Sequence, residues 1–167
     1  GDIDTNTNSI NDLIGYTKNF VSIFRRNYPD AGPNINELFY WNEVAMDKNT
    51  PFIIDAPPNN YNLRCLVNGL YRIRIRIWMT YNVAGTLEIV LQKFNGTPAL
   101  EEEYQLSAEY YGENRDLVHD LTTLAEVQYN DFFRFRMNSP DGGQMTIRGN
   151  TADRANLIYF ERLPGHD

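Results

Sequence analysis

Hydrophobic and polar side chains alternate strictly along the stretch that follows residue 69. Because successive side chains of a β-strand point to opposite faces, this period of two predicts a strand with one apolar face and one basic face. The apolar set is Tyr71, Ile73, Ile75, Ile77 and Met79, and the other set is Arg72, Arg74, Arg76 and Trp78.

Shorter apolar runs separated by turn residues precede and follow this strand. The turn signals include Asn95-Gly96 and the segment 139–143 (SPDGG). Many short strands at roughly ten-residue spacing, with no helical stretch between them, predict an all-β antiparallel sandwich or jelly roll. The expected strands lie at 37–46, 51–54, 61–67, 86–94, 104–111, 117–127, 132–137, 145–148 and 157–163.

The N-terminal segment shows a different periodicity. Residues 1–8 are polar and predict a tail, and the Ser9–Asp12 segment fits a helix start. Apolar spacings of three and four then predict a helix over 10–26, within a stalk segment at 9–28, before a jelly-roll head at 29–167. Two interpretations remain open: an amphipathic helix on its own domain, or a short coiled-coil stalk. The proposed seam is Ile10, Leu13, Thr17, Phe20 and Phe24.

Composition narrows the classes of function. The chain has 167 residues, one cysteine, two histidines and a net charge of -7. The acidic balance argues against nucleic-acid binding, and no apolar run is long enough for membrane insertion. One cysteine excludes an intramolecular disulfide framework, and so few histidines leave little for a metal site. We therefore expect neither cofactor nor metal.

Among the basic residues, arginine outnumbers lysine by 12 to 3. Arginine suits paired, partly buried charge better than lysine does. Arg134 and Arg136 repeat the alternation seen in the first strand. From these residues alone, a solvated outer face, where repulsion between like charges is screened, remains an equal alternative.

Several motifs resemble the trimeric jelly-roll family that includes tumour necrosis factor and the globular heads of the complement-one-q proteins. A Gly-x-Tyr strand at 67–73 precedes a strand that ends in the turn Lys93-Phe94-Asn95-Gly96. The segment 124–133 resembles the family's strand, Gly-Asp turn and strand, with Asn130 where glycine is usual. The segment 157–164 is similar to the final hydrophobic strand, although it carries Glu161 and Arg162.

The resemblance implies a trimer and a direction for the arginines. It places Arg72, Arg74 and Arg76 on the face toward the threefold axis, and Arg134 and Arg136 beside them in the same sheet. It also places Leu157, Tyr159 and Glu161 on that face, so that Glu161 is the expected acidic partner. A buried charge without a partner costs several kcal/mol, which makes such pairing or a bound anion necessary.

Catalytic signals are weak. His119 and Asp120 are neighbours in a strand and should point to opposite faces. Cys65 lies in an apolar strand, where a free cysteine is usually a small buried hydrophobe. The acidic run 101–103 fits a solvated loop, and the common phosphate-loop and hydrolase motifs are absent. The sequence therefore predicts a protein that is not an enzyme.

Three hypotheses for function follow. The first is a homotrimeric head of a viral or phage fibre that attaches to a host-surface receptor or glycan. A start at Gly1 and the coiled-coil stripe favour a piece of a longer fibrous protein on the virion surface. The second is a secreted, extracellular signalling or recognition ligand. The third is a monomeric carbohydrate-binding module. Tyr110 and Tyr111 cannot both face the core, which makes this pair a weak receptor-site candidate.

Overall fold

The described part of the protein is all-β. The computed structural model describes residues 19–45, 50–112, 115–150, 152 and 156–164, and this part contains thirteen strands and no helix. The strands are β1 (Phe20–Arg25), β2 (Ala31–Asn34), β3 (Asn36–Leu38), β4 (Glu43–Val44), β5 (Phe52–Ile54), β6 (Leu63–Cys65), β7 (Gly69–Val83), β8 (Gly85–Phe94), β9 (Leu100–Tyr111), β10 (Arg115–Val127), β11 (Phe132–Asn138), β12 (Gln144–Ile147) and β13 (Asn156–Arg162).

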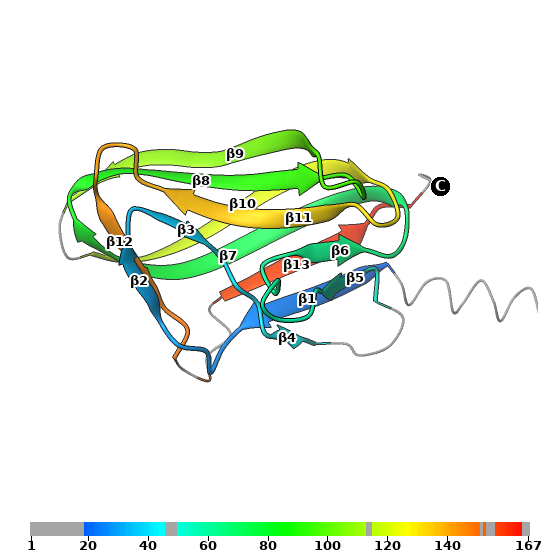
Figure 1. Ribbon diagram of the computed structural model, residues 1–167, viewed down its shortest axis with the longest axis horizontal. Coiled ribbons are helices and arrows are strands. Elements are labelled where there is room, and N and C mark those ends of the chain that lie inside the picture. The colour runs from blue at the N-terminus through cyan, green and yellow to red at the C-terminus, as the bar shows by residue number, and fades with distance from the viewer. Residues whose placement is uncertain (1–18, 46–49, 113–114, 151, 153–155, 165–167) are drawn as a thin grey trace, which may run out of the picture.

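The strands form two antiparallel sheets that pack as a sandwich (Figure 1). The seven-stranded sheet has the order β2-β12-β7-β13-β1-β4, and β10 pairs with the other edge of β7. The six-stranded sheet has the order β5-β6-β11-β8-β9, and β3 pairs with β11. The predicted all-β antiparallel jelly-roll sandwich is confirmed.

The connections between the sheets explain how the long strands come together. β7 leads directly into β8 in the opposite sheet, and β9 returns beside β8. The chain then crosses back, so that β10 pairs with β7 along its length, from Arg115 opposite Tyr81 to Val127 opposite Gly69. A strand that returns in this way beside an earlier one is the Greek-key arrangement of jelly rolls.

The core lies between the sheets and follows the alternation of the sequence. The five apolar residues predicted for one face of β7 are all fully buried. Phe52 of β5 stacks on Phe160 of β13 with ring centroids 3.8 Å apart, and it meets the ring of Tyr71 edge-on at 5.0 Å. These aromatic contacts join the two sheets across the sandwich interior.

The tight turn between β10 and β11 has Asn130 at the position where the resemblance has glycine. Asn130 has a φ of 72°, in the left-handed region that asparagine tolerates better than most residues. Its amide donates to the Cys65 carbonyl, and the Cys65 amide donates to the Asp131 carbonyl. The turn is thereby fixed against β6, as the strand-turn-strand resemblance implies.

The predicted N-terminal helix is wrong over the residues that the structure describes. Residues 20–25 form strand β1, which pairs with β13 from Phe20 opposite Glu161 to Arg25 opposite Asn156. Val21 and Ile23 point into the core. A short apolar run fits both periods, and here pairing with β13 and the strand preference of β-branched and aromatic residues prevail. Ile10 and Leu13 lie outside the described residues.

Candidate interaction face

Strand β7 presents its arginines on the side of the sheet that faces away from the core. The side chains of Arg72 and Arg74 are 51% and 53% exposed, whereas Ile73 and Ile75 between them are fully buried. Period-two alternation on a half-buried strand produces this difference directly. The predicted basic face of β7 is therefore present.

Strand β13 completes this face on one side of β7. The register places Glu161 opposite Arg72, Tyr159 opposite Arg74 and Leu157 opposite Arg76. Directly opposed residues of an antiparallel pair share a face, so the shared face predicted for these side chains is confirmed. An Arg72 Nη1 lies 3.3 Å from Glu161 Oε1, which makes Glu161 the acidic partner that the sequence proposed.

Strand β10 supplies a second carboxylate from the other side. Arg74 donates from Nε and Nη2 to the two oxygens of Asp120, at 2.9 and 2.7 Å. Arg76 donates to the same Oδ2 at 3.1 Å. The hydrogen bond from Arg74 is the main cause that lowers the pKa of Asp120 to about 2. Asp120 is thus held ionised between two guanidinium groups.

Sequence reasoning missed this role of Asp120. Alternation along β10 places it on the outward side, but its partner strand had to be known before it could be matched to Arg74 and Arg76. His119 is paired with Ile77 and lies on the opposite, inward-facing side. The prediction that the two neighbours point to opposite faces is confirmed.

Strand β1 extends the face beyond β13. Phe20 lies opposite Glu161 and its ring is 6.3 Å from that of Tyr159. Burial raises the pKa of Tyr159, and the charge of the nearby Glu161 raises it further. We call this outward surface of β1, β13, β7 and β10 the arginine face. Its members are Phe20, Ser22, Arg72, Arg74, Arg76, Trp78, Val118, Asp120, Thr122, Leu124, Leu157, Tyr159 and Glu161.

The arginine face contains a hollow and exposed apolar side chains as well as charges. The hollow has a volume of about 280 Å³ and is lined by Ser22, Arg74, Arg76, Leu157 and Tyr159. The exposed apolar members are Val118 at 61%, Leu124 at 52% and Phe20 at 42%. The face therefore joins apolar surface to arginines that already hold carboxylate partners.

Arg134 and Arg136 do not belong to this face, which corrects the prediction from the sequence. Their strand, β11, pairs with β8, β6 and β3 in the six-stranded sheet. Alternation predicted correctly that the two share one face of their strand, but it does not assign the strand to a sheet. Neither arginine forms an ion pair among the described residues.

Arg134 is instead held by aromatic rings and an amide. Its guanidinium carbon lies 4.5 Å from the ring centroid of Phe94, 4.9 Å from Tyr61 and 5.4 Å from Phe132. Its Nε donates to Asn62 Oδ1 at 2.8 Å. We call Arg134 with these three rings the stacking face, because the planar guanidinium gains cation–π contacts there without a carboxylate.

Glu37 and Glu43, two acidic residues of the early strands, contact other groups. Glu43 binds Arg26 through both carboxylate oxygens, at 2.5 Å each. Glu37 accepts a hydrogen bond from Asn34. Arg136 donates to Asn36 at 2.8 Å. Both glutamates therefore have partners other than the arginines of β7 among the described residues.

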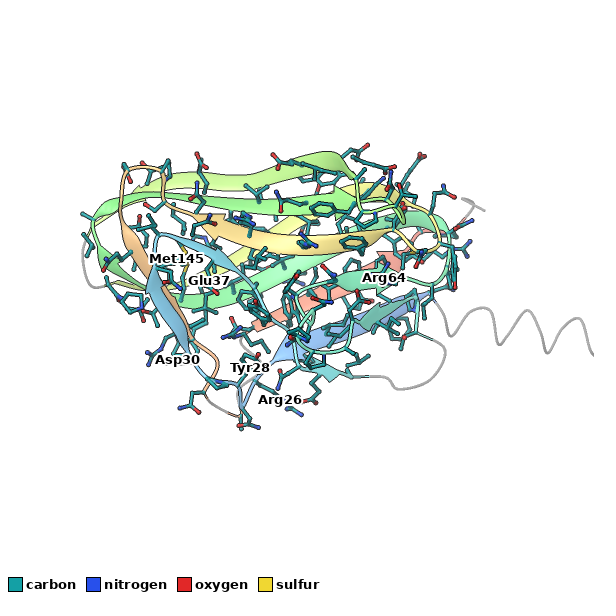
Figure 2. All side chains as sticks on the ribbon, in the orientation of Figure 1. Arg26, Tyr28, Asp30, Glu37, Arg64 and Met145 are labelled. Atoms are coloured by element: carbon teal, nitrogen blue, oxygen red, sulfur yellow. The ribbon has the colours of Figure 1, made fainter. Side chains whose placement is uncertain are left out.

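A second hollow, of about 320 Å³, is lined partly by Tyr28, Trp41 and Asn60. Two of the polar side chains that line it, Asn60 and Asp55, have hydrogen-bond partners. Asn60 donates to the Trp41 carbonyl at 3.1 Å, and Asp55 holds Arg64 through both oxygens. Tyr28 and Arg64 are labelled in Figure 2. These contacts brace the loops at this end of the sandwich.

The remaining candidates are Cys65 and the pair Tyr110 and Tyr111. Cys65 is fully buried, and burial raises the pKa of its thiol to about 12, so it is not a thiolate nucleophile. The side chains of Tyr110 and Tyr111 lie outside the described part; their backbones pair with Thr86 and Gly85. Among the described residues, no three histidine, cysteine, aspartate or glutamate side chains gather as metal ligands would.

Solved structures share this arrangement of strands. The mouse APRIL structure aligns with a TM-score of 0.57 and 8% identity, over 87% of this chain and 98% of that one. The globular domain of the zebrafish complement 1qA protein aligns with a TM-score of 0.57 and 13% identity, over 90% and 100%. The fold is that of tumour necrosis factor and the complement 1q heads.

The TNF/C1q fold extends over most of the chain, but the sequences have diverged widely. A second mouse APRIL structure aligns with a TM-score of 0.55 and 8% identity. No model of a protein family matches the chain, and no curated protein matches it significantly. In the part of the chain that the structure describes, no helix has the length and apolar character needed to cross a membrane.

Proposed function

We propose that the protein is a non-enzymatic recognition head that assembles as a homotrimer through the arginine face. The observation that carries this proposal is the combination, on one sheet, of exposed apolar side chains with arginines already matched to carboxylates. The resemblance to a family of trimeric heads supports threefold assembly. Closed rotational symmetry covers such a face in every copy and leaves none unpaired.

Two energetic terms favour burial of the arginine face. Val118, Leu124 and Phe20 are exposed apolar side chains, and their removal from water is favourable by about 25 cal/mol per Å², from which the entropy cost of association is subtracted. The second term concerns the charges. Arg72 and Arg74 each already contact a carboxylate at 3.3 Å or less, so burial does not leave them as isolated charges.

Recognition is proposed for the surfaces that such a trimer leaves in solvent. These include the stacking face and the loops at the ends of the sandwich. A non-enzymatic role is supported by the inert thiol of Cys65 and by the separation of His119 from Asp120 on opposite faces. We expect the partner to be a receptor or glycan on a host surface if the chain heads a viral fibre, or a receptor if it is an extracellular ligand.

The mass in solution tests the assembly directly. We expect light scattering to give close to three times the chain mass of 19.4 kDa at micromolar concentration. A monomer at that concentration would contradict the proposed function. A dimer would contradict it as well, because the proposed symmetry is threefold.

A matched pair of variants locates the interface. Val118→Asp places a charge on the arginine face, and Leu100→Asp places the same charge on the six-stranded sheet at a similarly exposed position. Both side chains are exposed in the single chain, so both variants should fold. We expect Val118→Asp to give a monomer and Leu100→Asp to remain a trimer; the reverse outcome would move the interface to the other sheet.

A further inference from the structure

We propose that the hollow of the arginine face binds a small tetrahedral oxyanion such as phosphate or sulfate. The inference extends the proposed function, because burial of this face by other copies is what makes the anion energetically necessary. It concerns a site made by Arg74 and Arg76 with the hydroxyl-bearing side chains of Ser22 and Tyr159.

Positive charge exceeds negative charge around the hollow. Two guanidinium groups line it, and no acidic side chain is among the described residues that do so. Asp120, which both arginines contact, lies on β10, across β7 from the β13 strand that supplies Leu157 and Tyr159 to the hollow. On the β13 side, Glu161 already contacts Arg72, which does not line the hollow. One carboxylate therefore serves two arginines, and the pair retains one positive charge.

Arg76 carries this uncompensated charge. Arg74 takes both oxygens of Asp120, at 2.9 and 2.7 Å, whereas Arg76 makes one longer contact of 3.1 Å to an oxygen that is already shared. A guanidinium group has five N–H donors. Most donors of Arg76 therefore have no carboxylate contact within the described part of the chain, and its side chain is 42% exposed to water.

Assembly of the trimer would remove the water that contacts the Arg76 side chain. A charge transferred from water to a protein interior costs several kcal/mol unless an opposite charge and hydrogen bonds replace the solvent. An oxyanion meets this need, because guanidinium groups bind phosphate and sulfate through directed, charge-assisted hydrogen bonds. Each copy contributes one such hollow, so the excess charge recurs in every subunit.

The size and lining of the hollow fit this class of ligand. A water molecule takes roughly 30 Å³ in the liquid. A hollow of about 280 Å³ thus holds an oxyanion together with several waters of hydration. The hydroxyl group of Ser22 adds a neutral donor, and Leu157 supplies an apolar wall.

Melting of the full chain in phosphate and in chloride at equal ionic strength tests the inference. Sulfate and phosphate also stabilise proteins in general by exclusion from their surface, so the wild type alone is not decisive. Arg76→Gln removes the excess charge from the hollow. Arg136→Gln removes the same charge from the six-stranded sheet, outside the arginine face, and is the matched control.

We expect a saturable rise of the melting temperature at millimolar phosphate in the wild type and in Arg136→Gln. Arg76→Gln should weaken the apparent phosphate affinity by about tenfold or more, the effect of losing one charged hydrogen-bond partner. An equal response of all three proteins would overturn the site. A trimer weakened by Arg76→Gln without any response to phosphate would also overturn it, because a carboxylate of a neighbouring copy would then occupy the hollow.

Light scattering on the same samples separates this inference from the proposed function. A trimer in every salt with no specific phosphate effect overturns the anion site and leaves the assembly intact. A monomer in every salt that still binds phosphate through Arg76 overturns the assembly and supports the site. A trimer whose dissociation is suppressed by phosphate, and not in Arg76→Gln, supports both.

Discussion

Two strands of this protein carry the same alternation of arginines and use it in different ways. On the arginine face, Arg72 and Arg74 contact carboxylates from two neighbouring strands. On the stacking face, Arg134 lies against three aromatic rings and one amide, and no ion pair is formed there among the described residues. The pattern of a strand thus determines which side chains share a face, whereas its neighbours determine how the charges are compensated.

The contrast has a consequence for assembly. Pairing of an arginine with a carboxylate at an exposed surface contributes little to folding in water, about 0–1 kcal/mol. It does lower the free-energy cost of burying both charges in an interface. Stacking of a guanidinium on rings already stabilises the single chain. We therefore expect substitutions on the arginine face to change mainly the association of subunits, and substitutions on the stacking face to change mainly the stability of each subunit.

The largest expected effect is that of Arg74→Glu. The new carboxylate would lie beside Asp120, and the buried face would hold two acids in place of an ion pair. We expect complete loss of the trimer, seen as a threefold fall of the mass in light scattering. Arg136→Glu makes the same charge change on the other sheet and should leave the mass unchanged; an equal loss in both variants would remove the distinction between the faces.

Removal of the partner of Arg72 should have the next largest effect. Glu161→Ala leaves a guanidinium unpaired at the assembled face, which we expect to weaken association by about 3 kcal/mol per fully buried site. Glu103→Ala removes an acid from the other sheet, where Glu103 accepts from Gln92. Measuring the mass of each variant as the protein is diluted should distinguish the two. If the Glu161→Ala trimer dissociates at the same protein concentration as the wild-type trimer, Glu161 does not stabilise the interface.

Truncation of Arg134 tests the stacking face. Arg134→Ala loses contacts with three rings, and we expect the free energy of unfolding to fall by about 2 kcal/mol. Arg134→Lys keeps the charge but lacks the planar group, so it should recover only part of the loss. Chemical denaturation measures both, and the mass of the folded protein should not change. Full recovery with lysine would show that charge, and not planar stacking, matters there.

The smallest expected effect concerns pH. The contact with Arg74 lowers the pKa of Asp120 from its ordinary value of 3.8 to about 2 in the folded state. The stabilisation that ionised Asp120 gives to the folded state is therefore present above pH 4 and is lost as the pH falls from 4 through 2. Asp120→Asn should show a smaller decline of the melting temperature over this range than the wild type. If the melting temperatures of both proteins declined in parallel, the ion pair would not contribute to the stability of the fold.

The sequence by itself determined the fold class and the faces of the long strands. Alternation specified that Ile73 faces the core and Arg74 does not, because the side-chain period of a strand is two. The resemblance placed a turn at Asn130, where glycine is usual, and the structure has a φ of 72° there. Glu161 could be named as an acidic partner because the resemblance placed the final strand in the same sheet as the arginines, and the register of β13 with β7 then selected Arg72.

Only the tertiary structure decided which strands became neighbours. Residues 20–25 fit a helical and an extended period equally well, and their pairing with β13 selected the strand. β11 joined the six-stranded sheet, so Arg134 met Phe94 instead of the carboxylate at 161. Asp120 reached Arg74 because β10 returns beside β7 across 46 residues of sequence. Pairing between distant strands depends on the packing of the whole core, and local pattern does not contain it.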